Sequence, residues 1–137
     1  RVKSITVMVQ KEVAERMVAK EGGKDYGVLS VSIAACGNAH ITRNVSRNMF
    51  NPAPNVDSAV VRIDIQNKYN LDLKDFNVFV KNIFSMRRKT LSNNLSQAYG
   101  LKREKLEQIY PKEVLSRRAE SFSLEEIVEL YRQMRAR

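Results

Sequence analysis

Residues 50–65 read FNPAPNVDSAVVRIDI and combine the most restrictive turn chemistry in the chain with its clearest strand. Residues 56–65 alternate as strands do and are rich in β-branched side chains, which predicts a β-strand. Pro52 and Pro54 each fix their own φ and push the preceding residue toward extended geometry. We therefore expect a stiff, non-helical turn that enters the strand and presents Phe50 in a fixed pose.

The Phe50 side chain has two interpretations at this stage. A phenyl ring at a strand entry can cap a hydrophobic core. A rigid ring can also stack on an unstacked nucleobase, a contact worth roughly 1 to 3 kcal/mol that needs no sequence-specific hydrogen bond. The spacing alone leaves both open.

Working toward the N-terminus, the pattern predicts two more strands and two helices. The apolar run at residues 5–9 suits a strand that is buried on both faces. Helical spacing follows over residues 10–19, and residues 22–23, a glycine pair, end it. Residues 26–36 fit a strand or a helix, and their apolar spacing leads us to choose a helix. Residues 39–45 alternate as the strand that precedes the proline-rich turn.

Residues 67–70 are polar and turn-like, and everything after them is helical in pattern. Asp72 is placed to cap a long helix that ends near Ser96. A shorter helix follows at residues 103–109, Pro111 suits the first turn of another, and residues 123–126 (SLEE) form a capping box for the last. The predicted fold class is α/β plus α: residues 1–66 hold three strands with helices, and residues 67–137 form a small all-helical domain.

The charge balance points to a polyanionic partner. The chain has 24 Lys and Arg against 15 Asp and Glu, a net charge of +9, so nucleic acid is the leading candidate and an anionic lipid surface the alternative. No stretch approaches the roughly 18 apolar residues of a membrane span, so we expect a soluble protein. Cys36 and His40 are each the only residue of their type, which argues against an intrachain disulfide, a metal site or a Ser-His-Asp catalyst.

Three consecutive cations, Arg87, Arg88 and Lys89, lie midway along the predicted helix at residues 72–96. The last two share a face with Lys81, whereas Arg87 lies near the apolar stripe and is able to bond within the fold. A solvated face and phosphate contact explain this pattern equally well. The candidate RNA-contacting cations are Arg43, Arg47, Lys81, Arg87, Arg88, Lys89, Lys102, Arg103, Arg117 and Arg118.

Four segments, in order and at matching spacing, resemble the ribosomal RNA adenine dimethyltransferases. They are residues 9–30 (VQKEVAER followed by KDYGVLS), 50–62, 87–91 (RRKTL) and 118–126 (RAESFSLEE). The bacterial small-subunit form is closer than the macrolide-resistance branch. The resemblance implies the end of a Rossmann-like, S-adenosylmethionine-dependent domain followed by a helical domain. It further implies a cytoplasmic enzyme of ribosome biogenesis that acts on small-subunit rRNA in the pre-30S particle.

The same resemblance implies roles for residues. Phe50 matches the aromatic that stacks on the target adenine, and the wall around that base matches Pro52, Pro54, Val56 and Ser58. The basic helix of ribosome contact matches residues 87–89. The cofactor loop and the Asn-Leu-Pro-Tyr motif of the family lie upstream of Arg1, so we expect no catalytic and no cofactor-binding residue here, and no activity from this chain alone.

The resemblance also predicts the strand order. The final strand, residues 56–65, is expected between the other two, which leaves the strand at residues 5–9 with a free edge that offers a route to self-association. The chain begins without Met, and we expect it to be part of a longer protein. Two alternatives stay open: a non-catalytic RNA- or ribosome-binding module, and a macrolide-resistance methyltransferase that modifies large-subunit rRNA.

Overall fold

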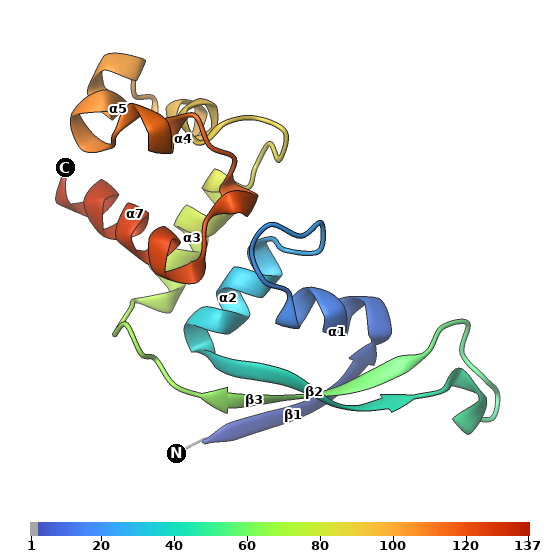
Figure 1. Cartoon of the computed structure of the whole chain (residues 1–137). Helices are drawn as coiled ribbons and strands as arrows, with labels where there is room; N and C mark the ends of the chain where they lie inside the picture. Colours follow the sequence, from blue (N-terminus) through green and yellow to red (C-terminus); the bar gives the residue numbers. More distant parts are fainter. Residues whose placement is uncertain (1–2) are drawn as a thin grey trace.

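A computed structural model describes residues 3–137 and places a three-stranded sheet beside a group of helices (Figure 1). The elements are, in chain order, β1 (Ser4–Gln10), α1 (Lys11–Val18), α2 (Val28–Cys36), β2 (Gly37–Val45), the 3-10 turn η1 (Arg47–Met49), β3 (Ser58–Ile65), α3 (Leu73–Ile83), α4 (Leu91–Tyr99), α5 (Arg103–Ile109), α6 (Lys112–Leu115), the 3-10 turn η2 (Ala119–Ser121) and α7 (Leu124–Ala136). The fold is therefore mixed α/β.

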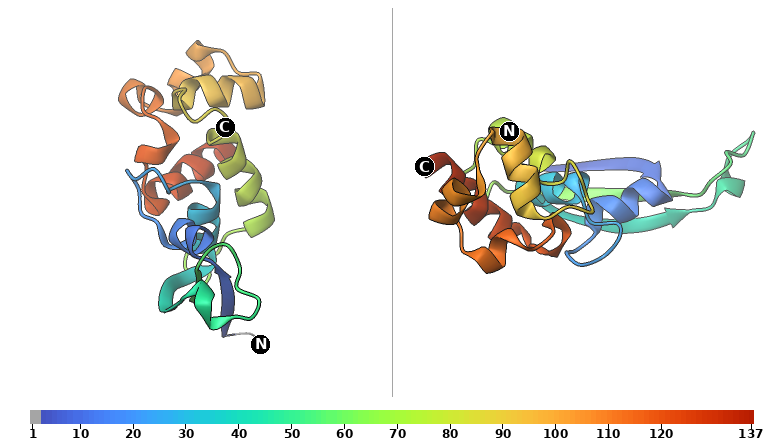
Figure 2. Two further views of the ribbon diagram at one scale, coloured as in Figure 1. Left: turned by 90° about the vertical axis from the view of Figure 1, so that its right-hand side faces the viewer. Right: turned by 90° about the horizontal axis from the view of Figure 1, so that it is seen from above.

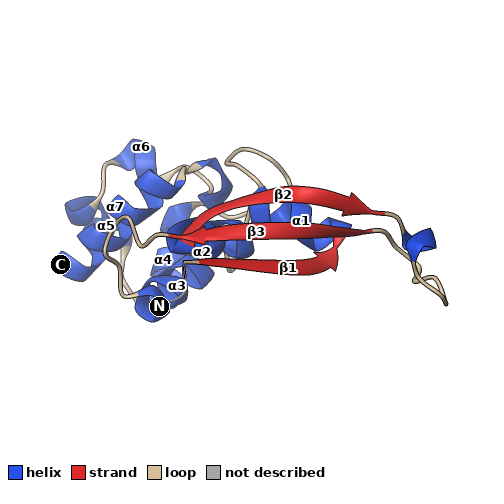
Figure 3. Ribbon diagram, turned by 90° about the horizontal axis from the view of Figure 1, so that it is seen from below, coloured by secondary structure: helices blue, strands red, loops and turns tan. Residues whose placement is uncertain are grey.

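The sheet has the predicted order. Its strands run β1-β3-β2 with both pairs antiparallel, so the last strand in sequence lies in the middle (Figure 3). Val61 of β3 pairs with Val7 on one side and with Ile41 on the other. A bulge in β2 between Ile41 and Arg43 shifts the register, which bends the strand as it approaches the proline-rich connection.

One face of the sheet is covered by helices and the other is not (Figure 1). Ala59 and Val61 of β3 are fully buried in a core that they share with Ala14 and Met17 of α1. On the other face, Met8 of β1 is 54% exposed. The expectation that residues 5–9 are buried on both faces was therefore wrong, because the described helices pack against one face only.

Helix α2 belongs to a second, larger core. Tyr26, Val31 and Ala35 pack in the same cluster as residues of the helices that follow the sheet, including Phe76 and Ile127. The prediction of a helix at residues 26–36 is confirmed. Because α2 shares its core with α3 and α7, the packing ties the two parts of the chain together, and the domain boundary after residue 66 stays a prediction.

The predicted long helix at residues 72–96 was wrong. Helix α3 ends at Ile83 and α4 begins at Leu91, with a turn between them. The buried side chain of Asn94 stabilises this turn: its amide donates to the carbonyls of Ile83 (3.0 Å) and Met86 (3.1 Å), and its oxygen accepts from the Met86 N–H (3.0 Å). Thr90 then caps α4 by accepting from Asn93 N–H at 3.3 Å. Residues 87–89 consequently lie in a turn and share no helical face with Lys81.

The predicted helix signals at the other termini are confirmed. Asp72 caps α3, and Ser123 forms a capping box with Glu126 at the start of α7. Gly100 ends α4 in the left-handed conformation, at φ 67°. Strand β3 begins at Ser58, two residues later than predicted. The connection from residue 46 to residue 57 is therefore a long loop.

Candidate nucleic-acid interface

The loop at residues 46–57 projects beyond the end of the sheet, on the side away from helices α3 to α7 (Figures 2 and 3). It carries exposed apolar side chains: Met49 is 67% exposed, Val56 46% and Phe50 37%. Phe50 therefore does not cap a core, and its ring is accessible to a ligand. The loop thus has the surface position that stacking on a base requires.

Three of the other predicted wall residues, Pro52, Pro54 and Val56, lie in the same loop, and Ser58 follows it. Pro52 and Pro54 are exposed, and the peptide bond that precedes Pro52 is cis. Ser58 is half-buried at the start of β3, where it pairs with Gln10 and Val45. Val56 lines a shallow groove of about 320 Å³ against the start of α1. The groove residues are Gln10, Lys11, Glu12, Glu15, Arg47, Asn55, Val56 and Asp57.

Arg47 is engaged within the loop. Its backbone N–H donates to Asp57 Oδ1 at 2.9 Å, and its guanidinium Nη1 donates to the carbonyl of Asn55, also at 2.9 Å. Arg43 lies in β2 at the bulge, where it pairs with Val60 and is exposed. Of the two arginines predicted near Phe50, one is thus part of the loop's own framework.

Two turns that carry cations and lie far apart in the sequence meet in the structure. The Leu91 N–H donates to the carbonyl of Arg117 at 2.7 Å, which brings the turn between α3 and α4 beside the segment that follows α6. Arg88 and Lys89 of the first turn and Arg118 of the second are all exposed. We call these three residues the basic turn cluster.

Arg87 and Arg117, in contrast, are used by the fold. The Arg87 guanidinium donates to the carbonyls of Lys24 and Tyr26 and lies 3.6 Å from the Glu120 carboxylate. These contacts agree with the prediction that Arg87 bonds within the fold.

Arg117 is held on three sides. Its guanidinium lies over the Phe122 ring at 4.1 Å, donates to the Ser121 carbonyl at 2.7 Å and pairs with Glu126 at 3.1 Å. Arg87 and Arg117 therefore position the surface loops around the basic turn cluster.

The remaining predicted cations lie elsewhere. Lys102 and Arg103 are at the start of α5, which Figure 1 shows at the end of the molecule opposite the loop at residues 46–57. Arg103 pairs with Glu107 of the same helix at 2.9 Å. Lys81 is in the last turn of α3. The structure therefore does not gather all ten predicted cations on one surface.

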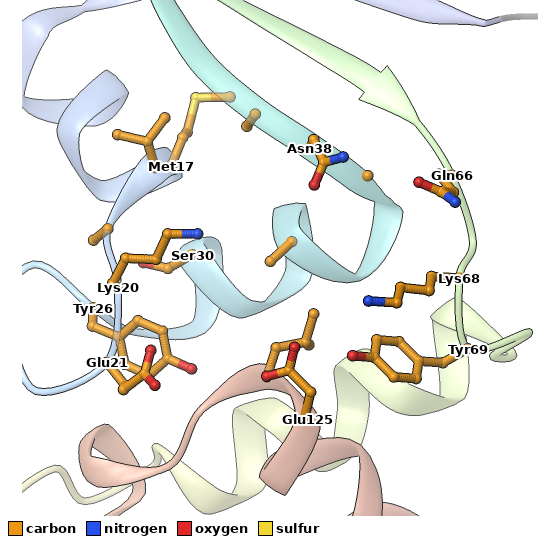
Figure 4. Close-up of a pocket in the computed structure, with 16 residues that line it drawn as sticks. Met17, Lys20, Glu21, Tyr26, Ser30, Asn38, Gln66, Lys68, Tyr69 and Glu125 are labelled. Atoms are coloured by element: carbon orange, nitrogen blue, oxygen red, sulfur yellow. The ribbon is translucent and has the colours of Figure 1, made fainter.

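A polar pocket that sequence reasoning missed lies between the sheet layer and α7 (Figure 4). It measures about 200 Å³ and combines the ammonium groups of Lys20 and Lys68 with the carboxylates of Glu21 and Glu125. Burial and a hydrogen bond to the Glu125 carboxylate raise the pKa of Tyr69. The lining comes from four regions of sequence, within residues 17–21, 26–39, 66–69 and 124–125, so no local motif could have predicted it.

Among residues 3–137, no group of three or more His, Cys, Asp or Glu side chains is placed to hold a metal ion. Within the same residues, no helix has the length and apolar character needed to cross a membrane.

Comparison with known proteins identifies the family. The family model for ribosomal RNA adenine dimethylase matches residues 1–132. The chain belongs to the ribosomal RNA adenine dimethylase family. Ribosomal RNA small subunit methyltransferase A of Chlorobium limicola is 41% identical over 95% of this chain and 48% of its own length, and that of Thermotoga maritima is 45% identical over 97% and 44%. This dimethylase-family chain therefore spans about half the length of the curated relatives it matches.

Solved structures share the fold of this dimethylase-family chain. A dimethyladenosine transferase from Plasmodium falciparum superimposes with a TM-score of 0.84 over 98% of this chain and 57% of its own, at 21% identity. The 23S rRNA methyltransferase ErmE superimposes with a TM-score of 0.61 over 97% and 55%, also at 21% identity. At such low identity the likeness supports the fold and carries no residue role.

Proposed function

We propose that this chain is the C-terminal part of an S-adenosylmethionine-dependent enzyme that dimethylates adenine N6 in small-subunit rRNA. The family match and the small-subunit methyltransferases among its relatives support the proposal. The observation that carries it is the exposed Phe50 ring on a proline-framed loop at the end of the sheet. Residues 1–66 would then be the end of a Rossmann-like domain and residues 67–137 a helical RNA-binding domain.

In this proposal the loop holds the target base. Adenine N6 is a weak nucleophile because its lone pair is delocalised into the ring, so the base must be held in one orientation for methyl transfer. Phe50 would stack on the extruded adenine, while Pro52, Pro54, Val56 and Ser58 form the wall beside it. No residue of this chain is assigned a catalytic role, and the chain alone is expected to be inactive.

The described residues do not fit the cofactor. A nucleotide-type site places a glycine-rich loop between a strand and the N-terminus of a helix. The Gly22-Gly23 pair instead lies between two helices, α1 and α2. S-adenosylmethionine would therefore be bound by residues outside this chain. Calorimetry on the chain alone should show no binding of the cofactor, and micromolar binding would contradict this assignment.

Contact with RNA phosphates is assigned first to the basic turn cluster, Arg88, Lys89 and Arg118. Their exposure and the net charge of +9 support this role. Arg43 would contact the backbone beside the flipped base, and Lys81, Lys102 and Arg103 would extend the surface. The partner is the pre-30S particle in the cytoplasm, and the free edge of β1 offers a route to self-association.

A fluorescence titration tests the stacking role. The chain is titrated into short single-stranded RNA that carries 2-aminopurine in place of one adenine. Phe50→Ala should remove the stacking-induced change in fluorescence and weaken binding about five- to hundredfold, whereas Phe50→Tyr should retain both. Val78→Ala, which removes another exposed apolar side chain from α3 (54% exposed), is the control. Equal binding and fluorescence for Phe50→Ala and the original chain would exclude the stacking role.

Two further experiments separate the rival functions. A non-catalytic binding module requires no glycine-rich loop or Asn-Leu-Pro-Tyr motif, so the sequence upstream of Arg1 distinguishes it from the enzyme. Methylation mapping with the complete protein distinguishes a small-subunit from a large-subunit RNA substrate. Modification of large-subunit RNA alone would replace our proposal by the macrolide-resistance function.

A further inference from the structure

The geometry points to Asp57 as a positioning residue that closes the loop carrying Phe50, with Arg47 as its partner. Neither residue would touch the target base. Together they would hold the ring of Phe50 in the orientation that stacking needs. This inference rests on the function proposed above. It changes the role that sequence reasoning gave to Arg47, from contacting phosphate to holding the loop closed. We call the bonds of Arg47 to Asp57 and Asn55 the clamp.

The first support is a pair of hydrogen bonds across the base of the loop. Asp57 Oδ1 accepts the backbone N–H of Arg47 at 2.9 Å, which joins the two ends of the segment 47–57. The Arg47 guanidinium then reaches to the Asn55 carbonyl, also at 2.9 Å. A single arginine thus contacts the returning arm of the loop through both its backbone and its side chain.

The second support is the anchor to α1. The backbone carbonyl of Asp57 accepts the N–H of Lys11, the first residue of α1, at 3.0 Å. Asp57 therefore fixes the loop on two sides, with its side chain toward Arg47 and its backbone toward α1. The backbone of Asp57 thereby ties the base of the loop to α1.

The third support is the scarcity of other restraints. Within the described chain, residues 51–56 make no backbone-to-backbone hydrogen bond, and Pro52 and Pro54 have no N–H to donate. The N–H of Phe50 reaches the Arg47 carbonyl at a long 3.4 Å. The side chains of this segment are exposed, so packing contributes little. The turn η1 is held by its own bonds from Met49 and Asn48 to Ser46. For residues 51–56, the clamp and the two prolines are what remains to fix the course of the chain.

A fixed loop matters because ordering a mobile segment on binding reduces affinity. If the clamp opens, the Phe50 ring is still able to stack on a base, but it is no longer held in one orientation. Loss of the clamp should therefore weaken stacking while leaving the number of phosphate contacts unchanged. A phosphate-contacting arginine would show the opposite pattern, since its loss flattens the dependence of affinity on salt.

The test is a double-mutant cycle on RNA binding, with the 2-aminopurine titration repeated at several salt concentrations. Asp57→Ala and Arg47→Ala should each weaken binding about three- to tenfold, with an unchanged salt slope. Asp57→Ala removes the bond to the Arg47 N–H, and Arg47→Ala removes the bond to the Asn55 carbonyl. Both free the same segment of the loop, so the losses in the double variant should be less than additive. Asp57→Asn keeps an acceptor oxygen and should bind as the original chain does. A flatter salt slope for Arg47→Ala, with additive losses in the double variant, would overturn the clamp.

A measurement made without RNA tests the clamp independently of the stacking role of Phe50. Amide hydrogen exchange of the Arg47 N–H should be slow in the original chain and in Asp57→Asn, and fast in Asp57→Ala. This holds even if Phe50→Ala shows that stacking plays no part in binding. Equal exchange of the Arg47 amide in all three proteins would exclude the clamp while leaving the stacking role intact. If Asp57→Ala fails to fold, the salt slope of Arg47→Ala still decides the question: weaker binding with an unchanged slope supports the clamp, and a flatter slope overturns it.

Discussion

The Arg87 guanidinium donates a 3.0 Å hydrogen bond to the carbonyl of Lys24, a residue 63 positions earlier in the chain. The same guanidinium also reaches the Tyr26 carbonyl and lies near the Glu120 carboxylate. It thereby joins the turn after α3 to the loop between α1 and α2. One cation of the three-residue run at 87–89 is thus a structural tether, while its two neighbours remain on the surface.

Replacement of Arg87 by Ala should destabilise the chain by about 1 to 3 kcal/mol, because charged hydrogen bonds to backbone carbonyls are lost. The neighbouring change Arg88→Ala should lie within about 0.5 kcal/mol of the original stability. Urea denaturation followed by circular dichroism measures both. Equal stability of the two variants would mean that the tether contributes nothing measurable.

The double substitution Arg88→Ala and Lys89→Ala should weaken RNA binding without lowering stability. Each lost phosphate contact should flatten the plot of log affinity against log salt by about 0.7 to 1. Lys74→Ala is a matched control, since it removes an exposed cation from the opposite end of α3. Fluorescence anisotropy with labelled RNA gives the slopes. A slope unchanged in the double variant removes the basic turn cluster from the RNA-binding surface.

Two glycines should respond differently to substitution by Ala. A Cβ at Gly37 would lie 2.0 Å from the backbone oxygen of Asp64, where β2 pairs with β3, so neither strand can yield. Gly37→Ala should cost about 3 kcal/mol or more. At Gly100 the space is open, and only the left-handed backbone at φ 67° resists a side chain, at a cost of about 1 kcal/mol. Thermal melts of the two variants give the order, and a reversed order would contradict this account.

The predictable features are those that local chemistry determines. Strand β3, the caps at Asp72 and Ser123, and the end of α4 at Gly100 each follow from a short stretch of residues. The break between α3 and α4 does not. The apolar stripe continues through it, and the turn exists because Asn94 and Arg87 bond to backbone groups brought near by folding. Thr90, a good cap, was the one local sign of a new helix.

The candidate site was predictable in part for the same reason. The proline-framed loop is a local motif, but its spacing left open whether Phe50 caps a core, and the exposure of the ring is seen only in the structure. The role of Arg47 depends on Asp57, which lies across the loop, and sequence nearness to Phe50 suggested phosphate contact instead. The turn that carries Arg88 and Lys89 lies beside the segment of Arg118 because the Leu91 N–H donates to the Arg117 carbonyl. No local pattern in the sequence predicts this hydrogen bond.

The contact between α3 and α7 makes stability depend on pH. Hydrogen bonds from Tyr131 (2.5 Å) and from Arg135 lower the pKa of Asp75 below its usual value. In the unfolded chain, the pKa of an Asp side chain is near 4. Because folding lowers the pKa of Asp75, its carboxylate stabilises the fold fully when the pH is above the unfolded value. This stabilisation is lost as the pH falls through the lower pKa of the folded state. Asp75→Asn should therefore melt at a lower temperature than the original chain near neutral pH, and the difference should shrink below about pH 4.

Thermal melts of both proteins across this range measure the difference directly. Asp72→Asn is the matched control: it changes a carboxylate one turn away on the same helix, and Asn caps a helix as well as Asp does, so its melting temperature should follow the original chain at every pH. The contact joins α3 to the C-terminal helix across 56 residues of sequence, so its loss should loosen the packing of α7. If Asp75→Asn melts at the original temperature near neutral pH, the carboxylate contributes nothing to this contact. A difference that persists unchanged in acid would show that the loss comes from packing and not from charge.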